Sequence, residues 1–264
     1  MATRLLHVSD LHVGAHEEPD VEASLVRIVG RIEPQLVVAS GDLSHRGRRG
    51  QLERAAEFLR SLGPPVLAVP GNHDIPHTPA RFVRPWTEFE RVWETTEPVA
   101  SLAGVHVVGI NSARPFHHQS GGLGGGRLEH AVARLGQGEP RAARVAVLHH
   151  HLANAPWRAP RKRPLARRSD ALSALAGAGA ELILGGHTHQ AAIYERHEFE
   201  VLEEGGARTV LAVAPGLGRP RPRRLGEARG FHVHEIDNEA IVVRTYLWTR
   251  GAFVLAAERR FLRA

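Results

Sequence analysis

The chain has 264 residues, of which 42% are apolar and 5% aromatic. This length exceeds the usual domain size of about 100–150 residues but fits one large α/β domain, and the apolar share excludes a disordered or collagen-like chain. The formal net charge is +6, and Lys162 is the only lysine among 34 Lys and Arg residues. The absence of cysteine excludes disulfides, cysteine zinc sites, iron–sulfur clusters and a thiol nucleophile.

The first third alternates short apolar runs with helical patterns. Residues 4–8, 36–39 and 66–69 read as strands, and the apolar spacing of residues 21–32 and 51–62 predicts two amphipathic helices. Strand–helix–strand units of this length form right-handed crossovers, so we expect a parallel sheet covered by helices.

The rest of the chain carries three further helix patterns and many strands. We expect helices at residues 79–93, 128–135 and 170–178, and strands at 99–102, 105–110, 144–148 and 181–184. Residues 191–264 are rich in strands, predicted at 191–195, 199–202, 209–214, 230–236, 240–247 and 253–256. With no repeat or linker, we interpret residues 1–264 as one domain whose last third forms a second sheet or extends one.

No segment reaches the length of about 18 uninterrupted apolar residues that a membrane helix needs. The apolar run at residues 5–8 begins soon after Met1 and has only the length of a core strand, so it does not read as a signal peptide. We therefore expect a cytoplasmic protein with no membrane partner.

Polar side chains follow five of the predicted strands at the point where each strand ends. They are Asp10 and His12; Asp42; Asn72, His73 and Asp74; His149, His150 and His151; and His187 and His189. Ligands in open α/β sheets bind outside the carboxyl ends of the strands, so these side chains should meet at one edge. Glycines at 41, 71, 185 and 186 would let the backbone turn tightly beneath them.

Acids and imidazoles gathered at one edge repel one another and lose solvation unless a cation compensates them. Carboxylate, carboxamide and imidazole ligands without thiolate suit Mn²⁺, Fe²⁺ or Zn²⁺ better than Ca²⁺ or Cu⁺. Seven candidate ligands are too many for one tetrahedral ion and suit two ions about 3.5–4 Å apart. They are Asp10, His12, Asp42, Asn72, His149, His187 and His189.

This set of motifs resembles the calcineurin-like metallophosphoesterase superfamily, and the match runs in order from residue 5 to residue 190. Residues 40–44, residues 69–76 and the histidines after residue 148 further resemble its bacterial cyclic-nucleotide phosphodiesterase-like branch. The resemblance implies a two-sheet αββα sandwich with mixed sheets flanked by helices, and a phosphoric ester hydrolase that depends on two divalent metal ions.

The resemblance also implies a role for each site residue. The first ion would be held by Asp10, His12 and His189, the second by Asn72, His149 and His187, with Asp42 bridging the two. Family members often have proline two residues after the fourth-motif histidine, where this chain has His151. That departure leaves His150 as an alternative ligand, although His149 directly ends the strand.

The expected reaction is attack on phosphorus by a hydroxide that bridges the two metal ions. Asn72 and His73 would contact the substrate, and His73 would protonate the leaving alkoxide. Asp74 would either fix the tautomer of His73 or cap backbone amides in its turn. His45 and Arg46 lie just past Asp42 and could either approach the phosphate or belong to a solvated loop.

The favoured substrate is a small phosphodiester, with cyclic nucleotides as one candidate. A metal-dependent nuclease or phosphomonoesterase is the alternative, and a scaffold without catalysis is the least favoured interpretation. Basic residues in the loop at 153–168 and at 219–224 could attract nucleic acid, but neither run has interleaved aromatic residues for base stacking. The sequence leaves a homodimer open.

Overall fold

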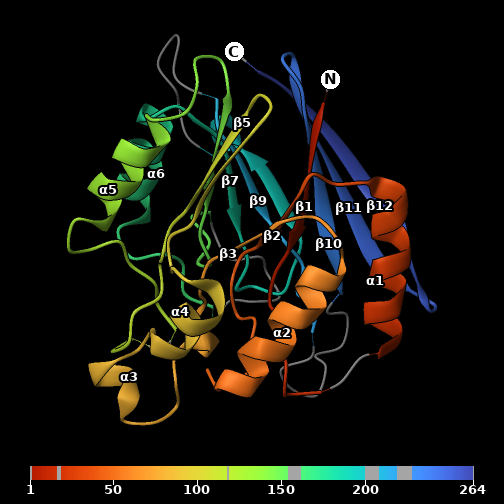
Figure 1. Cartoon of the computed structure of the whole chain (residues 1–264). Coiled ribbons are helices and arrows are strands. Elements are labelled where there is room, and N and C mark those ends of the chain that lie inside the picture. The colour runs from red at the N-terminus through yellow and green to blue at the C-terminus, as the bar shows by residue number, and fades with distance from the viewer. Residues whose placement is uncertain are drawn as a thin grey trace.

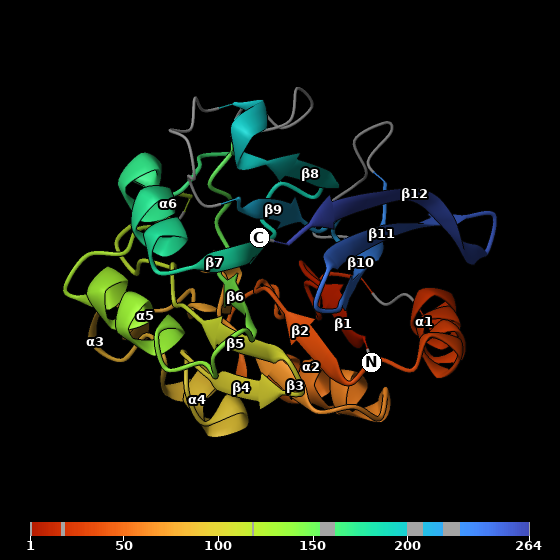
Figure 2. The same cartoon turned by 90° about the horizontal axis from the view of Figure 1, so that it is seen from above.

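The computed structural model describes residues 2–16, 19–117, 119–153, 162–199, 208–218 and 228–263. In this part of the chain two six-stranded sheets pack face to face, and helices cover their outer faces (Figures 1 and 2). The predicted αββα sandwich of two mixed sheets is therefore confirmed. The interpretation of residues 1–264 as one domain stays a prediction.

The first sheet has the strand order β12-β11-β10-β1-β2-β3. Its strands β1 (Thr3–Val8), β2 (Leu36–Ala39) and β3 (Val66–Ala68) run parallel, as the alternating strand and helix patterns predict. Strands β10 (Gly230–Ile236), β11 (Ala240–Thr249) and β12 (Ala252–Leu262) extend this sheet with antiparallel pairings.

The second sheet has the order β4-β5-β6-β7-β9-β8. Strands β5 (Val105–Gly109), β6 (Ala143–Val147), β7 (Ala180–Gly185) and β9 (Val210–Val213) are parallel to one another. Strands β4 (Val99–Leu102) and β8 (Ala192–Glu195) pair antiparallel at its two edges. The last third of the chain thus contributes to both sheets.

Alternate side chains of the strands fill different layers of the core. Leu5 of β1 belongs to the core layer between the sheets, together with Val107 and Val145, whereas Leu6 belongs to the layer that includes the helices outside the first sheet. That outer layer is formed by α1 (Pro19–Ile32), α2 (Arg49–Ser61) and α4 (Thr87–Trp93). Helices α5 (Arg127–Leu135) and α6 (Arg168–Gly177) cover the second sheet. Burial on both faces explains why the central strands read as continuous apolar runs.

The single helix predicted at residues 79–93 is wrong. The structure has two short helices there, α3 (Ala80–Val83) and α4, with Pro85 between them. Proline has no backbone N–H and disfavours helical geometry in the residue before it, so the helical pattern is interrupted at this point.

Some predictions fall on residues outside the described ranges. These are residues 154–161 of the basic loop at 153–168, the basic run at 219–224 and residues 200–202 of the strand predicted at 199–202. Phe199 itself directly follows η2, a short 3₁₀ helix at Arg196–Glu198.

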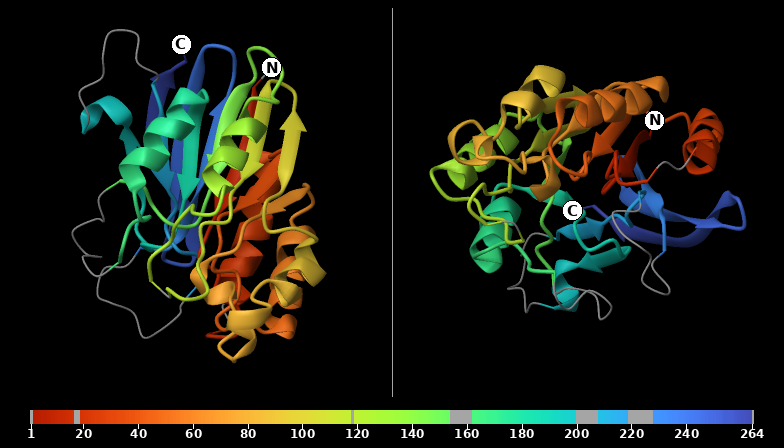
Figure 3. Two further views of the ribbon diagram at one scale, coloured as in Figure 1. Left: turned by 90° about the vertical axis from the view of Figure 1, so that its left-hand side faces the viewer. Right: turned by 90° about the horizontal axis from the view of Figure 1, so that it is seen from below.

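Among the described residues, no helix combines the length and apolar character that crossing a bilayer requires. The parallel strands of both sheets end on the same side of the molecule, and the labelled termini lie at the opposite end (Figures 1 and 3). The loops that leave the carboxyl ends of β1, β2, β3, β6 and β7 carry the candidate site.

Candidate metal centre

Every side chain predicted for the site lies just beyond the carboxyl end of a strand. Asp10 and His12 follow β1, Asp42 follows β2, and His149 follows β6. The 3₁₀ helix η1 (Asn72–Asp74) follows β3, and His187 and His189 follow β7. All are buried except His73, which is partly exposed.

The backbone of this site is unusual, because five of the seven candidate ligands have a positive φ. They are Asp10 at 53°, His12 at 49°, Asp42 at 53°, His187 at 70° and His189 at 58°. Residues with a Cβ rarely adopt this region, which costs about 1–2 kcal/mol each. The sharp turns aim these side chains back into one space, and the surrounding fold must hold them there.

Two glycines are needed because other groups approach the backbone closely. A Cβ on Gly71 would lie 2.3 Å from both the backbone nitrogen and Oδ1 of Asp42, and one on Gly186 would lie 1.9 Å from Oγ of Ser9. Gly41 combines a positive φ of 89° with a close approach, since a Cβ there would lie 2.7 Å from the backbone nitrogen of Gly71. Three of the four glycines predicted here are thus required by close neighbours, and Gly41 by its φ as well, whereas Gly185 has neither a positive φ nor a close neighbour.

Three side chains gather around one position beside β1. Nε2 of His189 lies 3.1 Å from Oδ1 of Asp10, and Nε2 of His12 lies 3.7 Å from the same oxygen. Oδ2 of Asp10 is occupied, since it accepts hydrogen bonds from Oγ of Ser9 at 2.7 Å and the backbone N–H of His187 at 3.0 Å. Oδ1 is buried and has no hydrogen-bond partner among the described residues, so it is available to a cation.

A second group gathers Asp42, His149 and His187. Nε2 of His149 lies 3.4 Å from Oδ2 of Asp42 and 3.2 Å from Nδ1 of His187. Nδ1 of His149 donates to the carbonyl oxygen of Ser40 at 2.8 Å. A carbonyl oxygen only accepts, so this bond leaves the Nε2 lone pair of neutral His149 facing Asp42.

Asp42 connects the two groups. Its Oδ2 lies 3.7 Å from Nε2 of His12 and 3.4 Å from Nε2 of His149, and it is buried without a hydrogen-bond partner in the described part of the chain. Its Oδ1 accepts from the backbone N–H of His73 at 2.8 Å. One oxygen is thus fixed by the protein, while the other faces both groups.

Asn72 has the unpaired buried polar atoms that suit a metal ligand. It is 1% exposed, and neither its Oδ1 nor its Nδ2 has a hydrogen-bond partner within the described residues. Buried polar atoms are normally paired, so several orphaned atoms in one place fit a centre that binds cations.

The charge states also fit cation binding. Burial would raise the pKa of Asp42, but His149, His73 and His12 together hold it well below its usual value. Burial likewise opposes ionisation of Asp10, whose pKa His189 and His12 keep low. Burial lowers the pKa of His12 to about 3, so this imidazole is neutral at pH 7. Ionised carboxylates beside neutral imidazoles are the state in which such side chains bind metals.

His149 differs from the other imidazoles. Burial opposes its protonation, but Asp42 outweighs that effect and raises the pKa of His149 to about 9. A proton therefore resides between these two side chains at neutral pH until a cation displaces it.

The hydrogen bonds of Asp74 favour the second of its two predicted roles, the cap of its turn. The Asp74 carboxylate accepts from the backbone N–H groups of Gly71, Leu43 and Ser44 and from the Ser44 hydroxyl, at 2.8–3.2 Å. Nδ1 of His73 bonds instead to the carbonyl oxygen of His45 at 2.9 Å. Asp74 caps its turn because its lone pairs are occupied by these donors, and a neighbouring loop orients His73.

The three consecutive histidines after β6 separate in space. His149 joins the second group, whereas Nδ1 of His150 lies 3.0 Å from Oγ of Ser112. His150 belongs to none of the possible metal-binding groups among the described residues. The geometry therefore favours His149, the residue that ends the strand, over the alternative.

Sequence reasoning missed part of the surroundings of the site. His7, His232 and His234 are fully buried between the sheets, and Nε2 of His7 lies 2.9 Å from Oγ of Ser40. Their alternation with apolar residues in β1 and β10 was the available signal, because it places them on the inner face of the first sheet. They extend the polar network inward from the loop that holds His149.

Comparison with known proteins agrees with this geometry. The sequence model of the calcineurin-like phosphoesterase family matches residues 3–191. A purple acid phosphatase from yellow lupin shares the fold, with a TM-score of 0.70, 11% identity, and coverage of 100% of this chain and 54% of that chain.

Two bacterial relatives carry phosphodiesterase names. A probable cyclic nucleotide phosphodiesterase of Synechococcus is 29% identical over 57% of this chain and 58% of its own length. The 3′,5′-cyclic adenosine monophosphate phosphodiesterase CpdA of Haemophilus influenzae is 25% identical over 75% of this chain and 74% of its own length. The chain thus spans less than two thirds of the Synechococcus protein. These names belong to the branch that the motifs resemble.

Proposed function

Because the chain belongs to the calcineurin-like phosphoesterase family, we propose that it is a dinuclear metal-dependent phosphodiesterase acting on small phosphodiesters. The observation that carries this proposal is Oδ2 of Asp42, which faces both groups of donors at 3.4–3.7 Å. A carboxylate oxygen shared in this way is suited to bridging two cations.

The proposed ligands follow the two groups. Asp10, His12 and His189 would hold one ion, Asn72, His149 and His187 the other, and Asp42 both. Manganese, iron and zinc suit this mixture of oxygen and nitrogen donors. When bound, such a pair neutralises phosphoryl oxygens and lowers the pKa of a water held between the ions.

The protein's own contribution to the reaction is proton transfer and orientation. In neutral His73 the proton sits on Nδ1, because this nitrogen donates to the carbonyl oxygen of His45. A proton given from Nε2 to the leaving alkoxide therefore returns the ring to the tautomer that the protein already stabilises. Asn72 and His73 are the side chains that we assign to substrate contact.

Cyclic nucleotides are the leading candidates within the diester class. Support comes from the names of the Synechococcus and Haemophilus relatives. The nuclease alternative depends on the basic residues at 153–168 and 219–224, of which residues 154–161 and 219–224 lie outside the described residues. A cytoplasmic location and a homodimer stay predictions.

The decisive experiment compares substrates with Mn²⁺ added. Bis-p-nitrophenyl phosphate, 3′,5′- and 2′,3′-cyclic nucleotides, p-nitrophenyl phosphate and single-stranded DNA would be assayed side by side. We expect turnover of the small diesters. Turnover of the monoester alone would favour a phosphomonoesterase, and turnover of DNA alone a nuclease; either result would reject the proposed substrate class.

A further inference from the structure

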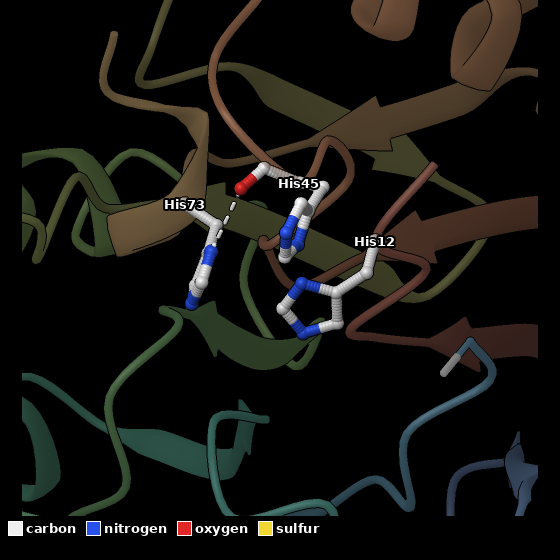
Figure 4. A group of neighbouring side chains, drawn as sticks. All are labelled: His12, His45 and His73. Carbon is white, nitrogen blue, oxygen red and sulfur yellow. Dashed lines mark hydrogen bonds between the residues drawn. The ribbon is translucent and has the colours of Figure 1, made fainter. Parts of the chain in front are cut away.

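Three imidazoles come together beside the proposed metal centre. His12, His45 and His73 leave the ends of three different strands, and Figure 4 shows their rings gathered around one space. A ring nitrogen of each lies within 4.8 Å of one from each of the others. His12 is buried, whereas His45 and His73 are partly exposed, so the cluster leads from the metal centre toward solvent.

His45 is the one member of this cluster that has no part in the proposed metal centre or in proton transfer. Its ring stacks on that of His73, with 5.6 Å between centroids and 20° between planes, and meets His12 edge-on at 6.2 Å. Its Nδ1 is buried and has no hydrogen-bond partner among the described residues. An unpaired buried polar atom is costly, which favours a ligand that completes it.

The surroundings of His45 favour an anion over a third cation. The cluster offers three nitrogens and no carboxylate, and Nε2 of His12 already faces Asp10 and Asp42. The electrostatic neighbours of His45 include the basic side chains of His73, Arg46 and His16, together with the carboxylate of Asp42. Imidazole N–H groups suit the oxygens of a phosphoryl group.

We propose that His45 is a second phosphate-binding side chain, which donates from Nδ1 to a phosphoryl oxygen next to the one that His73 contacts. This proposal deepens the proposed function and rests on it. His73 would serve the leaving oxygen, while His45 would hold the phosphoryl group against the metal pair. The backbone of His45 also orients His73, so one residue would position both the substrate and its proton donor.

Two substitutions distinguish the contribution of the Nδ1 donor of His45 from the contribution of its aromatic ring. His45→Phe keeps an aromatic ring to stack on His73 and removes both nitrogens, whereas His45→Asn keeps a donor near the position of Nδ1 and removes the ring. His130→Ala is the matched control, since His130 is an exposed histidine on α5 that pairs with Glu97.

Binding of inorganic phosphate to the Mn²⁺-loaded protein would be measured by calorimetry, together with Mn²⁺ stoichiometry and the KM for bis-p-nitrophenyl phosphate. His45→Phe should keep two Mn²⁺ per chain, weaken phosphate binding about tenfold, as loss of one hydrogen bond predicts, and raise KM. His45→Asn and His130→Ala should bind phosphate nearly as the parent protein does.

Unchanged phosphate affinity in His45→Phe would overturn the proposal, as would equal weakening in both His45 variants, which would assign the effect to the ring. A third Mn²⁺ in the parent protein that His45→Phe loses would make His45 a metal ligand and would also overturn it. If the parent protein binds phosphate but hydrolyses no diester, the proposed function fails, and the phosphate titration still decides the role of His45.

Discussion

The backbone N–H of His73 donates a hydrogen bond to Oδ1 of Asp42, with 2.8 Å between the two atoms. The proposed proton donor and the proposed bridging ligand are therefore joined through the main chain. A change in the side chain of His73 leaves this bond in place, whereas a change in Asp42 disturbs both. The first two predictions follow from this difference.

Asp42→Asn should lose metal and activity together. The amide has one oxygen instead of two and no charge, so it cannot both accept from His73 and bridge two cations. Metal content after dialysis against Mn²⁺ would be measured by elemental analysis beside kcat. Asp170→Asn, at an exposed ion pair with Arg167, is the control. Full occupancy of two ions in Asp42→Asn would contradict the bridging role.

His73→Ala should keep both ions and lose turnover. Its backbone N–H still donates to Asp42, but the proton donor for the leaving group is gone, which typically lowers kcat about 10²-fold or more. Steady-state kinetics with bis-p-nitrophenyl phosphate and a Mn²⁺ titration would check this. An unchanged kcat would remove His73 from the reaction.

Asp74→Asn should destabilise the fold rather than alter the action of His73. The carboxylate accepts from Gly71, Leu43 and Ser44, and an amide group would turn N–H donors toward some of them. We expect a loss of about 1–3 kcal/mol in the free energy of unfolding, measured with urea. The kcat per metal-loaded, folded molecule should change little. If the pH profile of kcat shifted while stability stayed unaltered, Asp74 would instead be the residue that orients His73.

The metal-free protein should become less stable as pH rises from about 6.5 to about 9. The pKa of His149 is raised from 6.5 to about 9 in the folded state, chiefly by Asp42 against the opposing effect of burial. The contribution of His149 to the free energy of unfolding is therefore complete below its pKa in the unfolded state. It is lost as pH rises through its pKa in the folded state. Urea unfolding in the presence of a chelator, across this range, would measure the effect.

The same proton predicts how Mn²⁺ affinity depends on pH. The ion must displace the proton from His149, so affinity at that group should increase as pH rises toward 9 and each binding event should release protons. Calorimetry in buffers of different ionisation enthalpy counts these protons.

The control for the stability prediction is metal-free His149→Gln, in which the stability loss between pH 6.5 and 9 should disappear. An identical dependence of stability on pH in this variant would assign the loss to another group.

Much of the site could be predicted from the sequence because side chains at the ends of parallel strands must share one edge. That rule brought Asp10 and His187 together although 177 residues separate them. The rule does not predict which carboxylate oxygen accepts a hydrogen bond from which donor. The role of Asp74 depended on where three backbone amides point, and the sequence left its two interpretations open.

The sequence also predicted most of the strands and helices outside the site. Apolar runs located the central strands, because both of their faces are buried. The helix predicted at 79–93 failed at Pro85, where a local restriction overrides the periodic pattern. The buried His7 and His234 follow a strand alternation, but only their packing between two sheets shows that they form a polar layer.

The positive φ angles of Asp10, His12, Asp42, His187 and His189 have a consequence for engineering. Glycine would relax the main chain at each of these positions, so a selection for thermal endurance alone would tend to accept it there and would erode the metal centre. Screens that aim to harden this protein against heat should therefore retain catalysis as a second criterion.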